Sequence, residues 1–222
     1  MANPEVELFR STGWTNTLWL DAEPLLDESV SNAAASVELL GIGFDYPKTG
    51  AVKRFRSRTD DIEGVSTGKT NFELIVVRGE YEDWPQQQLI NRWASVITHE
   101  VAHGVRYEHY ALSDTKMEHM ATEGLAYVTE YLAGMYTTPG MRHRRLAKSE
   151  LRYNPALGAK FREVVERPND GRLQKRWATE KTAHAYLSDM ELHAIQRVYQ
   201  QWRQGHNLSD LFLAPAKEVL DI

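Results

Sequence analysis

The sequence predicts an α+β protein in which a small N-terminal mixed sheet precedes a mainly helical C-terminal part. Short strand-like segments precede Gly79, whereas the segments after it repeat their apolar residues at helical spacing. With 222 residues, of which 42% are hydrophobic, the chain can bury one substantial core. We expect a single domain over residues 1–222, made of a mixed part (1–80), a helix pair (84–134) and a helical part (141–222).

The mixed part contains one predicted helix and several short strands. Trp14–Asp21 alternates loosely like a strand, and Pro24–Leu40 is periodic like a helix that ends at Gly41. Further strands are predicted at Gly43–Tyr46, at Ala51–Arg56 and, after a polar connection over Gly64–Lys69, at Phe72–Arg78.

Two helices are predicted next. Asp83 supplies a capping side chain and Pro85 a first-turn proline. The apolar face that follows consists of Leu89, Ile90, Trp93, Val96, Ile97 and Val101. A second helix is expected from Ser113 to its end at Gly134. The connection between them is short, which favours antiparallel packing.

The remaining chain is predicted to be helical. The expected elements are a turn at Thr137–Gly140, a helix from Asn154-Pro155 to Glu166, a turn at Pro168–Gly171, and a long helix over Leu173–Arg203 that Gly205 ends.

The most specific motif is His99-Glu100-Val101-Ala102-His103, inside the first helix of the pair. Residues four apart lie on one helix face, so both imidazoles can reach one metal ion. Glu100 is placed to contact a water bound to that metal. Hydrolysis needs a Lewis acid, a water molecule and a carboxylate that takes a proton from this water. We therefore expect one Zn²⁺ per chain.

Glu123 is the predicted third ligand, because antiparallel packing would bring the middle of the second helix back to the histidines. Gly124 beside it would allow close approach of the two helices. Glu118 and His119 are an alternative, but they lie about one turn away from the helix midpoint. Glu130 is interpreted as a solvated surface charge, and a partner of a ligating histidine is the alternative.

The motifs HEVAHGVR and TEGLAYV resemble the gluzincin metallopeptidases, in which HExxH is followed after about twenty residues by a glutamate ligand. They resemble most closely a bacterial family of zinc-dependent proteases with an E-G-L-A turn around the third ligand. The resemblance implies a zincin-like fold and peptide-bond hydrolysis at His99, Glu100, His103 and Glu123. Tyr127 stands where thermolysin-like enzymes place an aspartate that orients a histidine.

The expected reaction is attack of a zinc-bound water on a peptide bond, assisted by Glu100, in a peptide or protein substrate. The oxyanion donor is predicted to be Tyr186, with His184, Tyr127 and Arg106 as alternatives. Zinc peptidases commonly hold substrate along a sheet edge, and we expect Phe72–Arg78 to be that edge strand beside the active-site helix, with an ordinary buried strand as the alternative. Two other functions use the same residues: zinc-dependent hydrolysis of another amide or ester, and a non-enzymatic zinc-binding scaffold or regulator.

Composition excludes several function classes. The net charge of −5 gives no electrostatic footprint for nucleic acid, and the basic run Arg142–Arg145 is interpreted as a solvated helix face. No apolar run is long enough to cross a membrane. The absence of cysteine excludes thiolate ligands and disulfides. Met1–Glu5 has neither a basic start nor an apolar stretch, so we expect a cytoplasmic protein.

Overall fold

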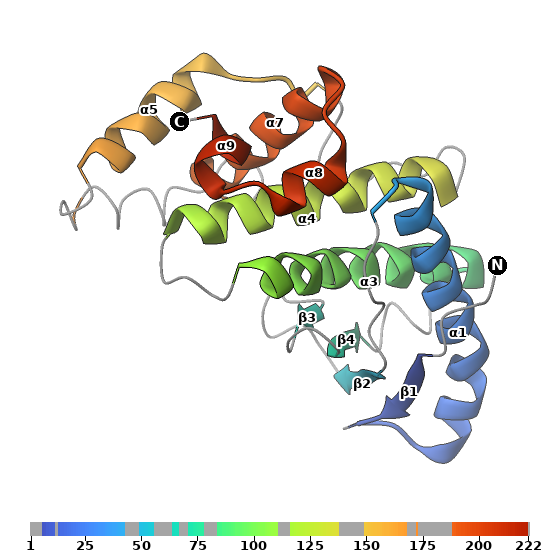
Figure 1. Cartoon of the computed structure of the whole chain (residues 1–222). Coiled ribbons are helices and arrows are strands. Elements are labelled where there is room, and N and C mark those ends of the chain that lie inside the picture. Colours follow the sequence, from blue (N-terminus) through green and yellow to red (C-terminus); the bar gives the residue numbers. More distant parts are fainter. Residues whose placement is uncertain are drawn as a thin grey trace.

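The computed structural model describes residues 6–11, 13–42, 49–55, 64–66, 71–77, 84–110, 116–137, 149–167, 172 and 188–221. Within them the chain is a mixed α+β structure dominated by helices, as predicted. Two long antiparallel helices, α3 (Gln86–His109) and α4 (Lys116–Thr137), lie at its centre. The small sheet lies against α3, and the C-terminal helices cover α4 on the opposite side (Figure 1).

The sheet has the strand order β1-β2-β4-β3. Three strands are parallel: β1 (Glu7–Arg10), β2 (Thr49–Phe55) and β4 (Asn71–Val77). The short β3 (Gly64–Ser66) pairs antiparallel with β4. The crossover that a parallel β1–β2 pair needs contains the helix α1 (Asn16–Leu39). The strands predicted near β2 and β4 are confirmed. The strand β1 was not predicted. The strand β3 lies in the segment where we expected a connection. The predicted strand at 43–46 lies outside the described residues.

The expected position of Phe72–Arg78 at a sheet edge is wrong. β4 pairs with β2 on one side and with β3 on the other, so it is an inner strand. Phe72, Leu74 and Val76 are each 1% exposed and belong to the core between the sheet and the helices. The most apolar strand takes an inner position because there both of its edges and one of its faces are covered.

The predicted strand at Trp14–Asp21 is also wrong, since α1 begins at Asn16. The Thr15 hydroxyl accepts a hydrogen bond from the Leu18 backbone N–H and caps the helix. Pro24, interpreted as a helix start, lies inside α1. A proline cannot donate to the carbonyl four residues earlier, here that of Leu20. Because Leu20 is 66% exposed and Pro24 is also exposed, that carbonyl lies on the water-facing side of the helix.

The C-terminal part consists of α5 (Pro155–Glu166), α7 (Asp189–Arg203), α8 (Leu208–Leu213) and α9 (Ala216–Leu220). The bounds of α5 match the prediction, because the Asn154 side chain caps it by accepting from the Ala156 backbone N–H.

Two predicted helix bounds are wrong. A continuous helix over 173–203 is not formed, because Ser188 has extended backbone and forms a capping box with Glu191 that starts α7 at Asp189. The segment 173–187 lies outside the described residues. In α4, Gly134 is buried within the helix and does not end it.

Two hydrophobic cores lie on opposite sides of the helix pair. One is formed by α1, the sheet and α3, with Leu26, Phe72 and Trp93 among its members. The other is formed mainly by α4 and the C-terminal helices, with Leu125 and Ile195 among its fully buried side chains. Of the helices in the described part of the chain, none is both long and apolar enough to cross a membrane.

Gly124 of α4 permits close packing against α7. We expected it to permit close packing against α3. A Cβ atom at Gly124 would lie 2.9 Å from the carbonyl carbon of Ala194.

We therefore expect Gly124→Ala to destabilise the fold, because overpacking costs about 1–3 kcal/mol. Alanine regains about 1 kcal/mol of helix propensity. Urea unfolding measures the net change, and Ala159→Gly on the exposed face of α5 calibrates the propensity. If Gly124→Ala stabilised the protein by the full gain in helix propensity, the close contact between Gly124 and Ala194 would be contradicted.

Candidate metal centre

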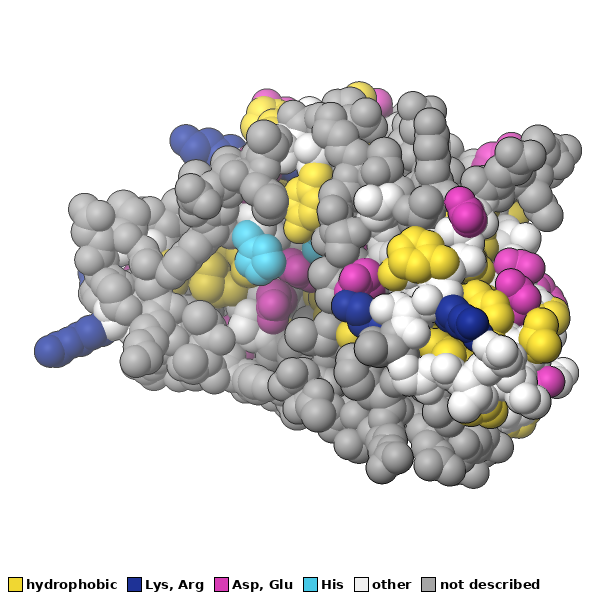
Figure 2. Space-filling view, turned by 90° about the horizontal axis from the view of Figure 1, so that it is seen from below, with side chains coloured by type: hydrophobic (Ala, Val, Ile, Leu, Met, Phe, Trp, Pro, Cys, Tyr) yellow, Lys and Arg dark blue, Asp and Glu magenta, His cyan; other side chains and the backbone are white. Residues whose placement is uncertain are grey.

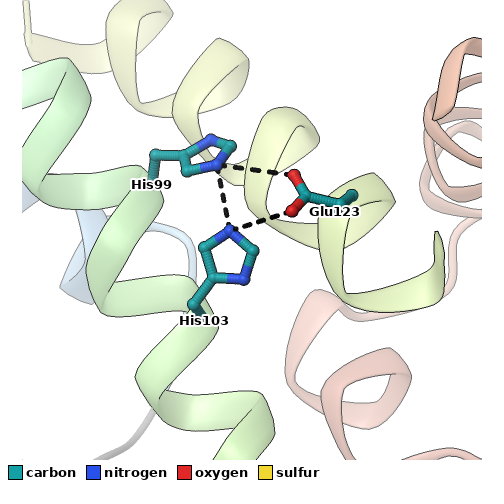
Figure 3. A group of neighbouring side chains, drawn as sticks. All are labelled: His99, His103 and Glu123. Carbon is teal, nitrogen blue, oxygen red and sulfur yellow. Dashed lines mark hydrogen bonds and ion pairs between the residues drawn. The ribbon is translucent and has the colours of Figure 1, made fainter. Parts of the chain in front are cut away.

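The two histidines of the motif project from one face of α3 toward α4. They lie one helical turn apart, and Glu123 extends from the facing turn of α4 to meet them (Figure 3). His99 Nε2 lies 3.1 Å from His103 Nε2 and 3.7 Å from Glu123 Oε2. His103 Nε2 lies 3.6 Å from Glu123 Oε1. The antiparallel pair thus brings together the three residues that the sequence predicted as ligands.

These separations fit a bound metal ion. The possible ligand atoms of His99, His103 and Glu123 all lie within 4.8 Å of one another. An ion bonded at about 2.0–2.1 Å in tetrahedral geometry needs ligand atoms about 3.3–3.4 Å apart. The 3.1–3.7 Å separations bracket that value. The group could therefore hold a metal ion without movement of the helices.

The ligand group lies close to the surface without being fully exposed. The side chains of His99 and Glu123 are 13% and 18% exposed, whereas that of His103 is 8% exposed. Seen from below, histidine and acidic side chains gather near the middle of the molecular surface, with hydrophobic side chains next to them (Figure 2). The ligand group is therefore partly accessible to solvent.

Glu130 holds the ring of His99, and its interpretation as a solvated charge is wrong. Its side chain is only 4% exposed, and its Oε2 lies 3.2 Å from His99 Nδ1. The Ser95 hydroxyl donates to Oε1 at 2.7 Å, and Arg92 lies 3.7 Å from the same oxygen. With Nδ1 held by a carboxylate, His99 presents Nε2 to the ligand group.

The electrostatics of the two histidines differ. Burial alone would lower the pKa of His99, but the hydrogen bond and charge of Glu130, with the charges of Glu100 and Glu123, raise it to about 9. Burial lowers the pKa of His103 well below its ordinary value, and the charges of His99 and His119 lower it further. Burial also raises the pKa of Glu123, against the charges of His99 and His119. His103 is therefore a neutral imidazole, which is the form that binds metals.

Glu100 follows His99 on α3 and is 8% exposed. Its carboxylate is close enough to raise the pKa of both His99 and Tyr107 by its charge. It therefore lies beside the ligand group without belonging to it. The predicted oxyanion donor Tyr186 and its alternative His184 lie outside the described residues.

Arg106 and Glu118 do not belong to the site. Arg106 is fully buried, and its guanidinium donates to the carbonyls of Phe212 at 2.7 Å and Ala214 at 2.6 Å. It also donates to Glu118 Oε2 at 2.7 Å, while Glu118 Oε1 accepts from the Ala216 backbone N–H at 3.0 Å. We call this group the C-terminal clamp. It excludes Arg106 as an oxyanion donor and Glu118 as a ligand.

Sequence reasoning missed Tyr107, which lies next to the site. Its ring stacks on that of His103, with centroids 5.9 Å apart and planes at 23°. The same four-residue spacing that linked His99 to His103 extends to Tyr107 and could have revealed it. Tyr127 instead meets the ring of His99 edge-on, with centroids 4.6 Å apart.

Comparison of the chain with protein-family models, with curated proteins and with solved structures gave no match. The resemblance of its two motifs to the gluzincins therefore stays a prediction.

Proposed function

We propose that this protein is a zinc-dependent metallopeptidase that hydrolyses peptide bonds. The observation that carries the proposal is the convergence of His99, His103 and Glu123, with the carboxylate of Glu100 beside them. Two imidazoles and one carboxylate are the protein ligands of catalytic zinc in several peptidases. A zinc ion held there would supply a Lewis acid that acidifies water and polarises a carbonyl group.

The residues around the ligands have distinct roles in this proposal. Glu100 accepts a proton from the attacking water and passes it to the leaving amine as the C–N bond breaks. Glu130 and Ser95 keep the His99 ring in one orientation. A structural zinc site would close its coordination with a fourth protein ligand. Within the described part of the chain, the ligand group contains three residues, which favours a site with an open position.

Cleavage of a peptide library, followed by mass spectrometry, tests the proposal. We expect cleavage by the zinc-loaded protein, its loss with a chelator, and its return when zinc is added. Elemental analysis of the purified protein identifies the metal, since the same ligand set also serves iron(II) in oxygenases. Zinc binding without cleavage of any peptide would contradict the proposed activity, and cleavage restricted to other amides or esters would change its substrate class.

Zinc binding is expected to release a proton from His99. Because the pKa of His99 is raised to about 9, this ring is protonated at pH 8 in the metal-free protein and must lose its proton to bind zinc. Zinc affinity should therefore fall as the pH is lowered below about 9. In Glu130→Gln the hydrogen bond and charge that raise this pKa most are absent, so burial is opposed only by the charges of Glu100 and Glu123.

Calorimetry in buffers of different ionisation enthalpy measures the released protons. At pH 8 we expect the wild-type protein to release more protons per zinc ion than Glu130→Gln. Glu163→Gln is the control, because Glu163 lies on the exposed face of α5 and pairs with Arg167. Equal proton release by the wild-type protein and Glu130→Gln would show that Glu130 does not set the protonation of His99.

A further inference from the structure

The proposed hydrolysis requires a hydrogen-bond donor that no ligand residue supplies. Attack of water on a peptide carbonyl places negative charge on its oxygen, and enzymes stabilise this charge with a fixed donor. The donor has to lie beside the ligand group, within reach of a carbonyl oxygen that a bound metal would polarise. The following inference therefore rests on the proposed function.

Tyr107 lies on the same flank of α3 as Glu100. At 100° per residue, His103 lies about 40° around the helix from His99, Tyr107 about 80° and Glu100 about 100°. The base and the tyrosine thus lie on one side of the two ligands. Arg106 lies about 20° around the helix in the opposite direction, which agrees with its burial in the C-terminal clamp.

The side chain of Tyr107 points back along the helix toward the ligands. Long side chains in helices cover the turn that precedes their own Cα atom. The ring of Tyr107 accordingly stacks on that of His103, with 5.9 Å between the centroids. A phenol keeps its proton at neutral pH, so the hydroxyl can donate a hydrogen bond.

The hydroxyl of Tyr107 is also free to act on a substrate. The side chain is half-buried, and its hydroxyl has no hydrogen-bond partner among the described residues. The alternatives in the described part of the chain are placed differently. Arg106 is committed to the carbonyls of Phe212 and Ala214, and Tyr127 lies at the His99 end of the site.

We propose that Tyr107 is a catalytic residue whose hydroxyl donates a hydrogen bond to the carbonyl oxygen of the scissile peptide bond. Stacking on His103 holds the ring beside the ligand group, on the flank of α3 that also carries Glu100. The charge that develops on the carbonyl oxygen would thus meet a donor already in place.

Tyr107→Phe tests this role, because it removes the hydroxyl and keeps the ring that stacks on His103. We expect kcat to fall by about 10²-fold, with KM and zinc affinity nearly unchanged. Tyr127→Phe removes the competing hydroxyl at the other end of the site, and Tyr131→Phe, whose ring contacts Tyr199, is the control. A loss in Tyr127→Phe as large as that in Tyr107→Phe would overturn the assignment.

Binding of an N-phosphoryl dipeptide to the zinc-loaded proteins gives a second readout that needs no turnover. Its tetrahedral, anionic phosphoryl group resembles the tetrahedral carbon of the transition state, and one phosphoryl oxygen takes the place of the charged carbonyl oxygen. Tyr107→Phe should therefore weaken its binding by about 10²-fold. Equal binding by Tyr107→Phe and the wild-type protein, or no binding by either, overturns the role of Tyr107. Weaker binding by Tyr107→Phe, in a wild-type protein that cleaves no peptide, refutes the proposed reaction and retains the donor.

Discussion

Glu100→Gln is expected to lower peptide hydrolysis by about 10²–10⁴-fold while one zinc ion per chain stays bound. Glutamine has the size of glutamate but cannot accept a proton at neutral pH. Glu100 is outside the ligand group, and its carboxylate lies near His99 and Tyr107. The loss should therefore appear in kcat, because substrate contacts and metal ligands remain.

Paired measurements of activity and zinc content check this prediction. Glu163→Gln carries the same chemical change on α5, far from the motif in sequence, and should keep full activity. His103→Ala should lose both zinc and hydrolysis, which separates removal of a ligand from removal of the base. Undiminished hydrolysis by zinc-loaded Glu100→Gln would refute the role of Glu100 as the general base.

Arg106→Met is expected to destabilise the fold by about 3–5 kcal/mol, the usual effect of removing one partner of a buried ion pair. The substitution would leave the Glu118 carboxylate without its guanidinium partner, and the Phe212 and Ala214 carbonyls without a donor. Because Arg106 is fully buried, water cannot replace these bonds without opening the contact between α3 and the segment around α8.

Urea and thermal unfolding of the zinc-free protein measure this effect apart from metal binding. For a protein of this size, a loss of about 3–5 kcal/mol lowers the melting temperature by about 10 °C. Arg203→Met is the control, because Arg203 is exposed at the end of α7 and should change stability by less than about 0.5 kcal/mol. An unchanged unfolding midpoint for Arg106→Met would show that the clamp contributes no net stability.

Local signals predicted helices well where the ends are capped by nearby residues. Asn154 and Pro155 define the start of α5 because the cap bonds join residues two apart in sequence. The same reasoning failed at Pro24, since a proline inside a helix is tolerated when the carbonyl four residues earlier faces water. Whether that carbonyl faces water depends on which side of α1 packs on the sheet.

Strand positions were less predictable, because pairing partners are distant in sequence. The apolar segment Phe72–Arg78 predicted a strand, and the structure buries its Phe72, Leu74 and Val76. Its inner position depends on β2 and β3, and no local pattern specifies which strands will flank it.

The sequence by itself determined that His99 and His103 share one helix face with Glu100 beside them. This follows from helix periodicity alone, because residues four apart are neighbours on any α-helix. Only the tertiary structure decided which acidic residues of α4 meet these histidines. Glu123 joins the ligand group and Glu130 binds the far side of His99, whereas Glu118 joins Arg106 in the C-terminal clamp. The physical reason is that the packing of α3, α4 and α8 sets these contacts, and the bonds that hold Arg106 join residues more than a hundred positions apart.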